Sequence, residues 1–538
     1  MEAKNYIQRY EALKSSEHFT NNQTLAQDVA SLFLPRRSDI SEKKSTGTEA
    51  GWYDRIFESA PITAGQILAA GQFDLLFTGR WFETDSPFGD STHEQYQAYS
   101  VVGQRMMKRI EGSNFKLEIQ EFLADRSTIH TAAMIAEADE EDGVYFTHLP
   151  YGTYVIDENH KKRVDTLFRE FKLTARSALQ KFGEDALKGK QIAEALEDEA
   201  LKSKKFKFVH CIEPRLRRKG TPRSDDKPWK SVYVCVEDDC IIREGGYDEQ
   251  PFVVSRFNRW GESPYGTGPS HIELTTARAL QKMKQTWLAL GDRITSPGIF
   301  VLPDQVDDPN PFGVTVVSDT SAALGFPREW KTQGDYNISL DAIRVEIRKL
   351  EESFFVPLFK LLTSDSERNR EKTAFETSKM LEEQVSRASP TFSRLDEEVT
   401  IPILNRLFGI MLRNNEFDDI LEHLVSVDDG GSPVGVETPR INFTSKLARA
   451  MKAIESNSFM QWLQENIPVF EMFPEAKDNF NPDSWVRASW KGKGLSGEHL
   501  KSEDDVEQER EVRNEQIQQQ AQLQAGQQAS QISKNISG

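Results

Sequence analysis

The sequence has few cysteines and no long apolar run. Only three of its 538 residues are cysteine, namely Cys211, Cys235 and Cys240, and no apolar signal segment precedes them. These features predict a protein of the reducing cytosol without a disulfide framework. No stretch approaches the run of about eighteen apolar residues that a membrane-spanning helix requires, so we expect no membrane segment.

An excess of positive charge is also missing. The chain has 85 acidic and 67 basic residues and a net charge of −18. Such a chain is not expected to wrap nucleic acid regardless of sequence, because that mode of binding depends on many lysine and arginine contacts to phosphate. Any contact with DNA must therefore be local. The length is enough for several hydrophobic cores, about three or four ordinary domains.

Catalytic motifs are absent as well. The nine histidines are scattered along the chain, and neither G-x-S-x-G nor H-E-x-x-H occurs. The acidic groups VEDD and ADEEDG stand in turn-like contexts. We therefore expect no catalytic residue and no enzymatic activity.

A metal site is not expected either. His210, Cys211, Cys235 and Cys240 are four possible ligands, but they form neither a C-x2-C motif nor a second close pair. His210 and Cys211 are adjacent in a strand-like run, so their side chains should point to opposite faces. Cys235 and Cys240 flank the predicted hairpin turn VEDD and are interpreted as small apolar strand residues. No metal and no cofactor is expected.

What the sequence does contain is a change of pattern near Gly143. Before it, the runs at 31–40 and 52–77 show helical spacing of apolar residues, with Pro61 placed to begin a helix after Ser59. After it come short β-rich runs, VYFTHLPYGTYVIDEN, KFKFVHCIEPRL, KSVYVCVEDDCIIREGG and QPFVVSRFN, with one helix, TARSALQKFGEDALK, between them. The predicted fold class is α+β and mainly helical.

The stretch 256–285 raises the question of a nucleotide site, because it is rich in turn residues: Gly261, Pro264, Gly266, Gly268 and Pro269. A P-loop requires lysine and a hydroxyl residue after its last glycine, whereas Thr267 and Gly268 follow Gly266 here. The loop is better explained as the structural start of a helix. Ser270 is the predicted N-cap, and Glu273 is its capping-box partner.

Downstream, the order of elements is unusual. The helix predicted over 271–292 leads into a Pro- and Gly-rich module at 299–338. A second long helix follows, in which Pro357 should cause a kink. The charged loop TSDSERNREK comes next, and then a third helix with Thr373 as N-cap and Glu376 as its capping-box partner.

This order and several stretches resemble the portal, or head-to-tail connector, proteins of short-tailed bacteriophages of the podovirus type. The stretches are FESAPITAGQILAAGQFDLLF, RSTIHTAAMIAEADEEDGVYFTHLPYGTYVIDEN, VDTLFREFKLTARSALQKFG, NRWGESPYGTGPS and EKTAFETSKMLEEQVSRASPTFSRLDEEVTIPILNRLF. They extend over about 52–408. The resemblance weakens over the C-terminal hundred residues, which are assigned by position only.

The resemblance implies an elongated protomer made of successive segments, twelve of which form a ring at one capsid vertex. The implied segments are a wing at 1–270, a first stem helix at 271–292, a clip at 293–339, a second stem helix at 340–362, a tunnel loop at 363–373, wing return helices at 374–415, a crown at 416–491, and a C-terminal barrel helix or disordered tail at 492–538.

The resemblance also implies function and partners. The ring would be the channel for packaging, retention and ejection of double-stranded DNA in the virion, after assembly in the host cytoplasm. Its partners would be its own copies, the terminase large subunit, a tail adaptor, and capsid and scaffolding proteins. The terminase would supply the packaging energy, since this chain has no nucleotide motif. The alternative is an oligomeric virion scaffold or adaptor that does not enclose DNA.

Two groups of residues become candidates through this resemblance. In the tunnel loop, Arg368, Arg370 and Lys372 alternate with acidic residues and would touch phosphates weakly; a solvated connector is the alternative. In the clip, the docking residues for the motor and the adaptor would be Asp307, Asp308, Asn310 and Phe312. The basic run LRRKGTPR at 216–223 precedes the clip and is expected to face protein partners.

Overall fold

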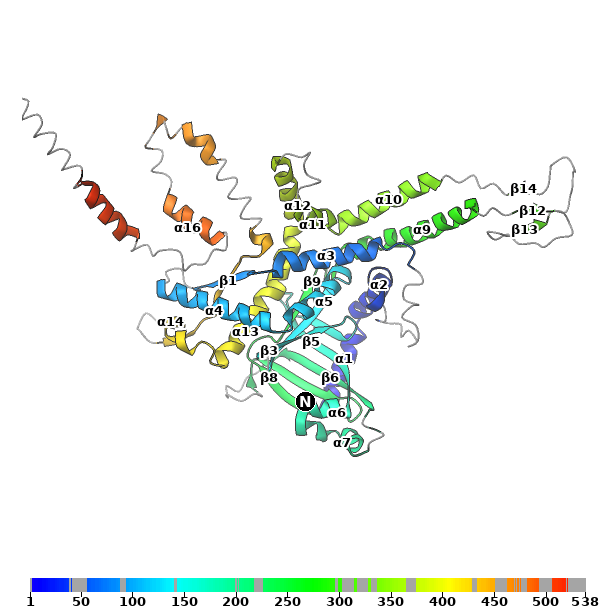
Figure 1. Ribbon diagram of the computed structural model, residues 1–538. Helices are drawn as coiled ribbons and strands as arrows, with labels where there is room; N and C mark the ends of the chain where they lie inside the picture. The colour runs from blue at the N-terminus through cyan, green and yellow to red at the C-terminus, as the bar shows by residue number, and fades with distance from the viewer. Residues whose placement is uncertain are drawn as a thin grey trace, which may run out of the picture. The chain divides into compact units, whose positions relative to one another are not determined.

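The β-rich runs after Gly143 contribute strands to two sheets around which the larger part of the chain is organised (Figure 1). The structure, a computed structural model, describes residues 2–37, 40, 56–87, 93–139, 143–198, 201, 203–216, 226–295, 299–301, 314–316, 328–329, 336–363, 374–427, 433–449, 462–468, 470, 472–473, 475, 481–492, 506–518 and 520. The chain divides into two units, Met1–Thr78 with Lys108–Glu416, and Gly79–Met107 with Phe417–Gly538.

A five-stranded antiparallel sheet is the centre of the first unit. Its strand order is β4-β5-β6-β7-β8, with β4 Tyr154–Glu158, β5 Val164–Thr174, β6 Lys205–Pro214, β7 Trp229–Cys235 and β8 Cys240–Tyr247. Along β6, Phe206 and Phe208 enter one hydrophobic cluster, whereas Val209 and Cys211 enter another. Since successive side chains of a strand alternate between faces, this strand is buried on both sides.

Helices cover both faces of that sheet. Side chains of α1 Ala3–Lys14 and α2 Glu17–Phe33 join the cluster that contains Cys211, whereas those of α6 Ala175–Phe182 and α7 Lys190–Glu197 join the cluster that contains Phe208. Residues at 31–40, predicted to be helical, leave the α-helix at Leu34. Pro35 begins a short 3-10 turn, Pro35–Arg37, because proline has no backbone N–H for an α-helical hydrogen bond.

The sheet contains the histidine and the three cysteines that were considered as metal ligands. His210 stacks on Tyr233, with ring centroids 3.8 Å apart, on the face opposite to Cys211, as the strand alternation predicted. Cys235 and Cys240 are paired across β7 and β8 beside the predicted turn. Within the described residues, no group of three or more His, Cys, Asp and Glu side chains is arranged to hold a metal ion.

A second sheet, of strand order β3-β2-β9, connects the body to the helices that follow. Its antiparallel strands are β2 Thr131–Asp139, β3 Gly143–Leu149 and β9 Phe252–Arg256. Helices α3 Ala60–Phe77 and α5 Phe115–Thr128 pack on one another, and α5 also packs on β2 and β3. Pro61 lies in the first turn of α3, as predicted. The hairpin of β10 Asn258–Trp260 and β11 Ser263–Thr267 follows β9.

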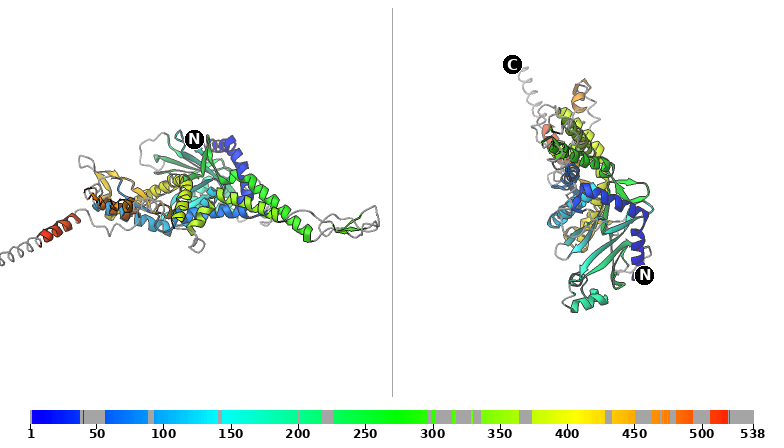
Figure 2. Two further views of the ribbon diagram at one scale, coloured as in Figure 1. Left: turned by 90° about the horizontal axis from the view of Figure 1, so that it is seen from above. Right: turned by 90° about the vertical axis from the view of Figure 1, so that its right-hand side faces the viewer.

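Two antiparallel helices then leave the body. The short α8 Pro269–Ile272 leads into α9 Leu274–Thr295, and α10 Tyr336–Ser353 returns beside α9 (Figures 1 and 2). We call α9 and α10 the stem. Between them the described residues form a three-stranded sheet of order β13-β12-β14, with β12 Ile299–Val301, β13 Val314–Val316 and β14 Arg328–Glu329.

The predicted second stem helix is interrupted. It was expected to continue over 340–362 with a kink at Pro357, but α10 ends at Ser353 and a separate helix, α11 Val356–Thr363, begins after it. Phe355 has a φ of 55°, a left-handed conformation that no α-helix accommodates. Pro357 lies in the first turn of α11, where a missing N–H has no cost, so it starts a helix rather than kinking one.

The return helices contain a π-turn. Helix α12 Ala374–Leu395 carries Pro390 in its interior, the five residues Asp396–Thr400 form a π-helix, and α13 Ile401–Arg413 continues from it. The expected N-cap of this segment, Thr373, lies outside the described residues. None of the described helices combines the length and the apolar character needed to cross a membrane.

The second unit contains β1 Phe82–Asp85, which pairs with β17 Arg440–Phe443. The unit also includes η7 Asp418–Ile420, α14 Leu421–Leu424, β15 Val425–Val427, β16 Pro433–Val436 and α16 Pro482–Gly492, whereas α4 His93–Gly112 spans the boundary between the units. The predicted α+β class, with helix predominating, is confirmed by the elements of both units.

Candidate functional site at the root of the stem

Of the predicted site residues, the structure describes one group. The tunnel-loop residues Arg368, Arg370 and Lys372 and the clip residues Asp307, Asp308, Asn310 and Phe312 lie outside the described residues, as does most of the basic run 216–223. Gly266, Gly268, Ser270 and Glu273 are described, and they lie where α9 leaves the body. We call this place the stem root: β9, the β10–β11 hairpin, α8 and the π-turn.

The predicted capping box at the stem root is wrong. Gly268, not Ser270, precedes the first helical residue, and no side chain caps α8. Ser270 is fully buried, and its hydroxyl contacts the Thr128 carbonyl and the His130 ring instead. Glu273 accepts a hydrogen bond from Ser353 at the end of α10, over 2.6 Å. Both side chains therefore serve tertiary contacts and are not available to the helix end.

Both glycines of the predicted helix start allow close approach. A Cβ on Gly266 would lie 2.2 Å from the His130 carbonyl oxygen, and one on Gly268 would lie 2.6 Å from Nδ1 of the His130 ring. Each distance is far below van der Waals contact. Glycine is therefore required because the β11–α8 segment runs directly against His130, not because a phosphate approaches the loop.

Arg126 is a fully buried guanidinium group beside this segment. It donates to Ser255 Oγ at 2.9 Å, to Gln72 Oε1 at 2.9 Å and to the Thr391 carbonyl at 2.8 Å. These acceptors come from a strand, from α3 and from α12, so one side chain ties three elements together. Burial lowers the pKa of Arg126 to about 10, which leaves it charged at neutral pH.

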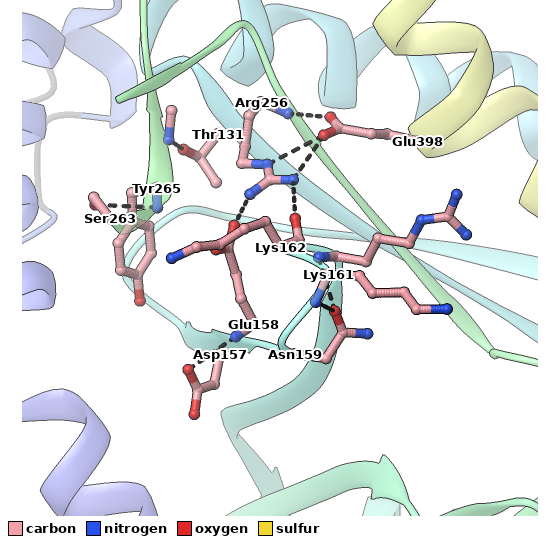
Figure 3. A network of polar contacts seen from close by, with 12 residues as sticks. Thr131, Asp157, Glu158, Asn159, Lys161, Lys162, Arg256, Ser263, Tyr265 and Glu398 are labelled. Atoms are coloured by element: carbon pink, nitrogen blue, oxygen red, sulfur yellow. Dashed lines mark hydrogen bonds and ion pairs between the residues drawn. The ribbon is translucent and has the colours of Figure 1, made fainter. Parts of the chain in front are cut away.

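Arg256 is the second buried guanidinium, at the end of β9 (Figure 3). Its Nη2 lies 2.9 Å from Glu398 Oε1 of the π-turn, its backbone N–H donates to Glu398 Oε2 at 2.8 Å, and its Nη1 is paired with Glu158. Nη2 also donates to the Lys162 carbonyl at 3.2 Å. Only 4% of the Arg256 side chain is exposed. Paired, multiply hydrogen-bonded charges are the form in which proteins tolerate burial.

The π-turn also contains a carboxyl group with a displaced pKa. Burial raises the pKa of Asp396 to about 7, against a lowering influence of Thr400 and of the Arg126 charge. A single π-turn inserted in a helix often marks a functional position, because it shifts the helical register by one residue. Here Arg126 contacts α12 just before the turn and Arg256 contacts the turn itself, so the two arginines fix that register.

Two histidines complete the root. The rings of His130 and His271 contact edge to face, with their centroids 4.8 Å apart. Burial lowers the pKa of His271 to about 4 and that of His130 well below its usual range. Both rings are therefore neutral at pH 7. His130 and Ser270 are hydrogen-bonded and fully buried, so this pair has no access to a substrate and positions α8 instead.

Sequence reasoning missed Arg126, Arg256 and Glu398. A signal was present for Arg256, which stands in the apolar strand FVVSR, but not for Arg126, whose helix carries many polar residues. A charged residue on an otherwise buried element must have buried partners. Its partners are distant in sequence, however: Glu398 is 142 residues from Arg256. The root is thus a base joined by buried hydrogen bonds and ion pairs, from which two antiparallel helices project.

A family model for bacteriophage head to tail connecting proteins matches residues 3–500 of this chain. The chain belongs to the head-to-tail connector family. This connector is 27% identical over 498 residues to the portal protein of Salmonella phage epsilon15, which covers 90% of this chain and 86% of that protein. It is 26% identical over 475 residues to the probable portal protein of Bordetella phage BPP-1. This alignment covers 86% of this chain and 82% of that protein.

These matches confirm the predicted family and, with it, a structural role between the head and the tail of a bacteriophage. The match extends beyond the stretches that carried the resemblance and includes most of the C-terminal region. The connector's stem root therefore stands within the matched residues, as do both return helices.

Proposed function

We propose that this connector is the portal of a phage particle: a ring of twelve copies, the number that the resemblance implies, at one capsid vertex. In this role it is the channel for packaging, retention and ejection of double-stranded DNA. The observation that carries the proposal is the family match over residues 3–500 together with two relatives named as portal proteins.

The stem supports assembly into a ring. Among residues 282–295 of α9, all of which the structure describes, none is buried. Leu288, Ile294 and Val345 are 43%, 48% and 50% exposed, although they are large and apolar. Two helices that bury one stripe each and leave such residues in water are suited to contact further helices. Neighbouring copies would supply them.

The charge supports a channel through which DNA slides. Each fixed lysine or arginine contact to phosphate adds salt-dependent affinity, so a conduit must have few of them. The chain has a net charge of −18, and in the loop 363–373 the residues Arg368, Arg370 and Lys372 alternate with acidic residues. We propose that this loop faces DNA and that the clip binds the terminase large subunit and later the tail adaptor.

The assembly is tested first. Light scattering and negative-stain images of the purified chain are expected to show a closed ring with a central hole. A stable monomer at micromolar concentration in moderate salt would contradict the ring. Open or irregular oligomers without a hole would favour the alternative, an oligomeric virion scaffold or adaptor that does not enclose DNA.

The tunnel loop is tested by replacing Arg368, Arg370 and Lys372 together with alanine. The variant should form rings with normal stability, because polar loop substitutions change the free energy of unfolding by only about 0.5 kcal/mol or less. Retention of packaged DNA should change, and the change should shrink as salt rises. Lys188→Ala, an exposed cation of the body outside both the loop and the stem, is the control. Unchanged packaging and retention at every salt concentration would exclude a channel role.

The clip is tested by deleting residues 307–313, which include Asp307, Asp308, Asn310 and Phe312. Rings should form as in the parent, whereas binding of the terminase large subunit in a pull-down should be lost. Unchanged binding would exclude this part of the clip as the docking site. A variant that fails to form rings would show instead that the clip contributes to assembly.

A further inference from the structure

Beside α8 lies a pocket of about 510 Å³ that the proposed function does not use. Its walls come from α2, from the β10–β11 hairpin and from α8, and they include Leu25, Trp260, His271 and Ile272. Trp260 and Ile272 are 70% and 74% exposed. Large apolar side chains that line one hollow and remain in water mark a binding surface.

The pocket also lacks carboxylate, ammonium and guanidinium groups. None of its eleven lining residues is Asp, Glu, Lys or Arg, in a chain of which 28% of the residues are charged. His271 adds no charge at pH 7, since burial lowers its pKa to about 4. DNA and a strongly basic or acidic protein segment would find no countercharge here. The pocket therefore fits an uncharged, apolar partner surface.

We infer that this pocket is one side of the contact between neighbouring copies of this chain, with the Trp260 indole at its centre. The inference rests on the proposed ring and identifies part of its interface. Two copies that each carry a net charge of −18 repel one another, so they associate most favourably where neither presents charge. We therefore expect an uncharged patch of the neighbouring copy to fit into this uncharged pocket.

A hollow without a matching hollow opposite it fits a cyclic assembly. In a ring each copy presents one face to the next copy and a different face to the previous one, so a hollow on one side receives a different patch of the neighbour. Tryptophan is among the residues most enriched at the centres of such contacts, and lysine and the acidic residues are depleted there. Trp260 directly precedes Gly261, whose φ of 52° closes the hairpin.

One polar atom of the pocket is left for the neighbour. The Nδ1 atom of His271 is buried and has no hydrogen-bond partner among the described residues. A neutral histidine has one acceptor nitrogen and one donor nitrogen, and either one buried without a partner is unfavourable. A polar group of the neighbouring copy, inserted beside Trp260 and Ile272, would satisfy it.

The test uses the full-length chain with Trp260→Glu and Ile272→Glu, each of which places a charge in the pocket. Leu117→Glu is the matched control, because Leu117 is 69% exposed on α5 and does not line the pocket. The two pocket variants should need at least about thirtyfold more protein for half-assembly in light scattering, the loss typical of a central interface residue. Leu117→Glu should assemble like the parent. Thermal unfolding of the monomers should be unchanged, since all three positions are exposed.

A second measurement identifies the occupant. A photo-reactive benzoyl-phenylalanine in place of Trp260 should form covalent dimers of this chain on irradiation, with the linked peptide mapped by mass spectrometry. Pocket variants that assemble like the parent would overturn the inference. Cross-links only to another virion protein would also overturn it. A parent chain that stays monomeric at every concentration would instead contradict the proposed ring itself.

Discussion

The stem root and the stem use charged residues in opposite ways. At the root, Arg256 is 4% exposed and holds two carboxylates, one from β4 and one from the π-turn. Along α10, Arg344 and Asp341 are also paired, but their side chains are 66% and 71% exposed. The same pair of chemical groups is therefore a tertiary connection in one place and a solvated surface in the other.

The difference shows which part of the protomer has its conformation fixed by contacts within one chain. Removing one partner of a buried ion pair leaves an uncompensated charge, whereas an exposed pair is replaced by water at little cost. The root is thus defined within one chain, and the stem surface is left for contacts with other copies. Four predictions test this contrast, from the largest expected effect to the smallest.

Arg256→Met should lower the free energy of unfolding by about 3–5 kcal/mol, because Glu158 and Glu398 would remain buried without their cation. Urea unfolding followed by circular dichroism at one protein concentration measures this. Arg344→Met on the stem should change the same quantity by about 0.5 kcal/mol or less. Equal effects at the two positions would remove the contrast between root and stem.

Gly266→Ala should lower the free energy of unfolding by about 1–3 kcal/mol, the range found for overpacking. The added Cβ would overlap the His130 carbonyl. Gly291→Ala in α9 is the control, since alanine is the better helix former and should be neutral or slightly stabilising. The midpoint of urea unfolding measures both. A neutral Gly266→Ala would show that the β11–α8 segment yields to the added methyl group.

Asp396 should make the stability of the body fall as pH rises. Its pKa is raised by burial from 3.8 to about 7, so between these values the folded chain holds a proton that the unfolded chain releases. Asp396→Asn should therefore be more stable than the parent at pH 8, by about 1–2 kcal/mol after allowance for partial exposure, and the advantage should disappear below pH 4. A difference independent of pH would contradict the displaced pKa.

Ser353→Ala should have the smallest effect, a loss of about 0.5–1.5 kcal/mol from one hydrogen bond to Glu273. The bond joins the end of α10 to the start of α9. Its loss should increase hydrogen exchange of the amides near residues 350–355 and leave those of β6 unchanged. If exchange is the same in variant and parent, the two ends of the stem are held by apolar packing alone.

Much of the fold follows from periodicity in the sequence. Alternation along β6 placed His210 and Cys211 on opposite faces, and Pro61 correctly marked the first turn of α3. These features depend on neighbours within a few residues. The family resemblance predicted the order of wing, stem and clip. The boundaries of these segments are still a prediction.

The errors occurred where distant residues determine local structure. Ser270 and Glu273 have the spacing of a capping box, but their side chains bind His130 and Ser353 instead. Helix α10 ends before Pro357 because Phe355 adopts a left-handed conformation. The Arg256–Glu398 contact joins residues that no local pattern relates. A sequence window shows which groups need partners, but not which partners the fold supplies.

The pairing of β1 with β17 has a consequence for synthesis. Phe82 lies opposite Phe443, and the Trp81 carbonyl accepts a hydrogen bond from the Thr444 amide. A ribosome that adds about 5–20 residues per second needs roughly 20–70 s to make the chain between the two strands. Throughout that time β1 has no partner strand, and an unpaired edge invites association with other chains. Among the described strands, β1 is therefore the one that waits longest for its partner and depends longest on protection from aggregation.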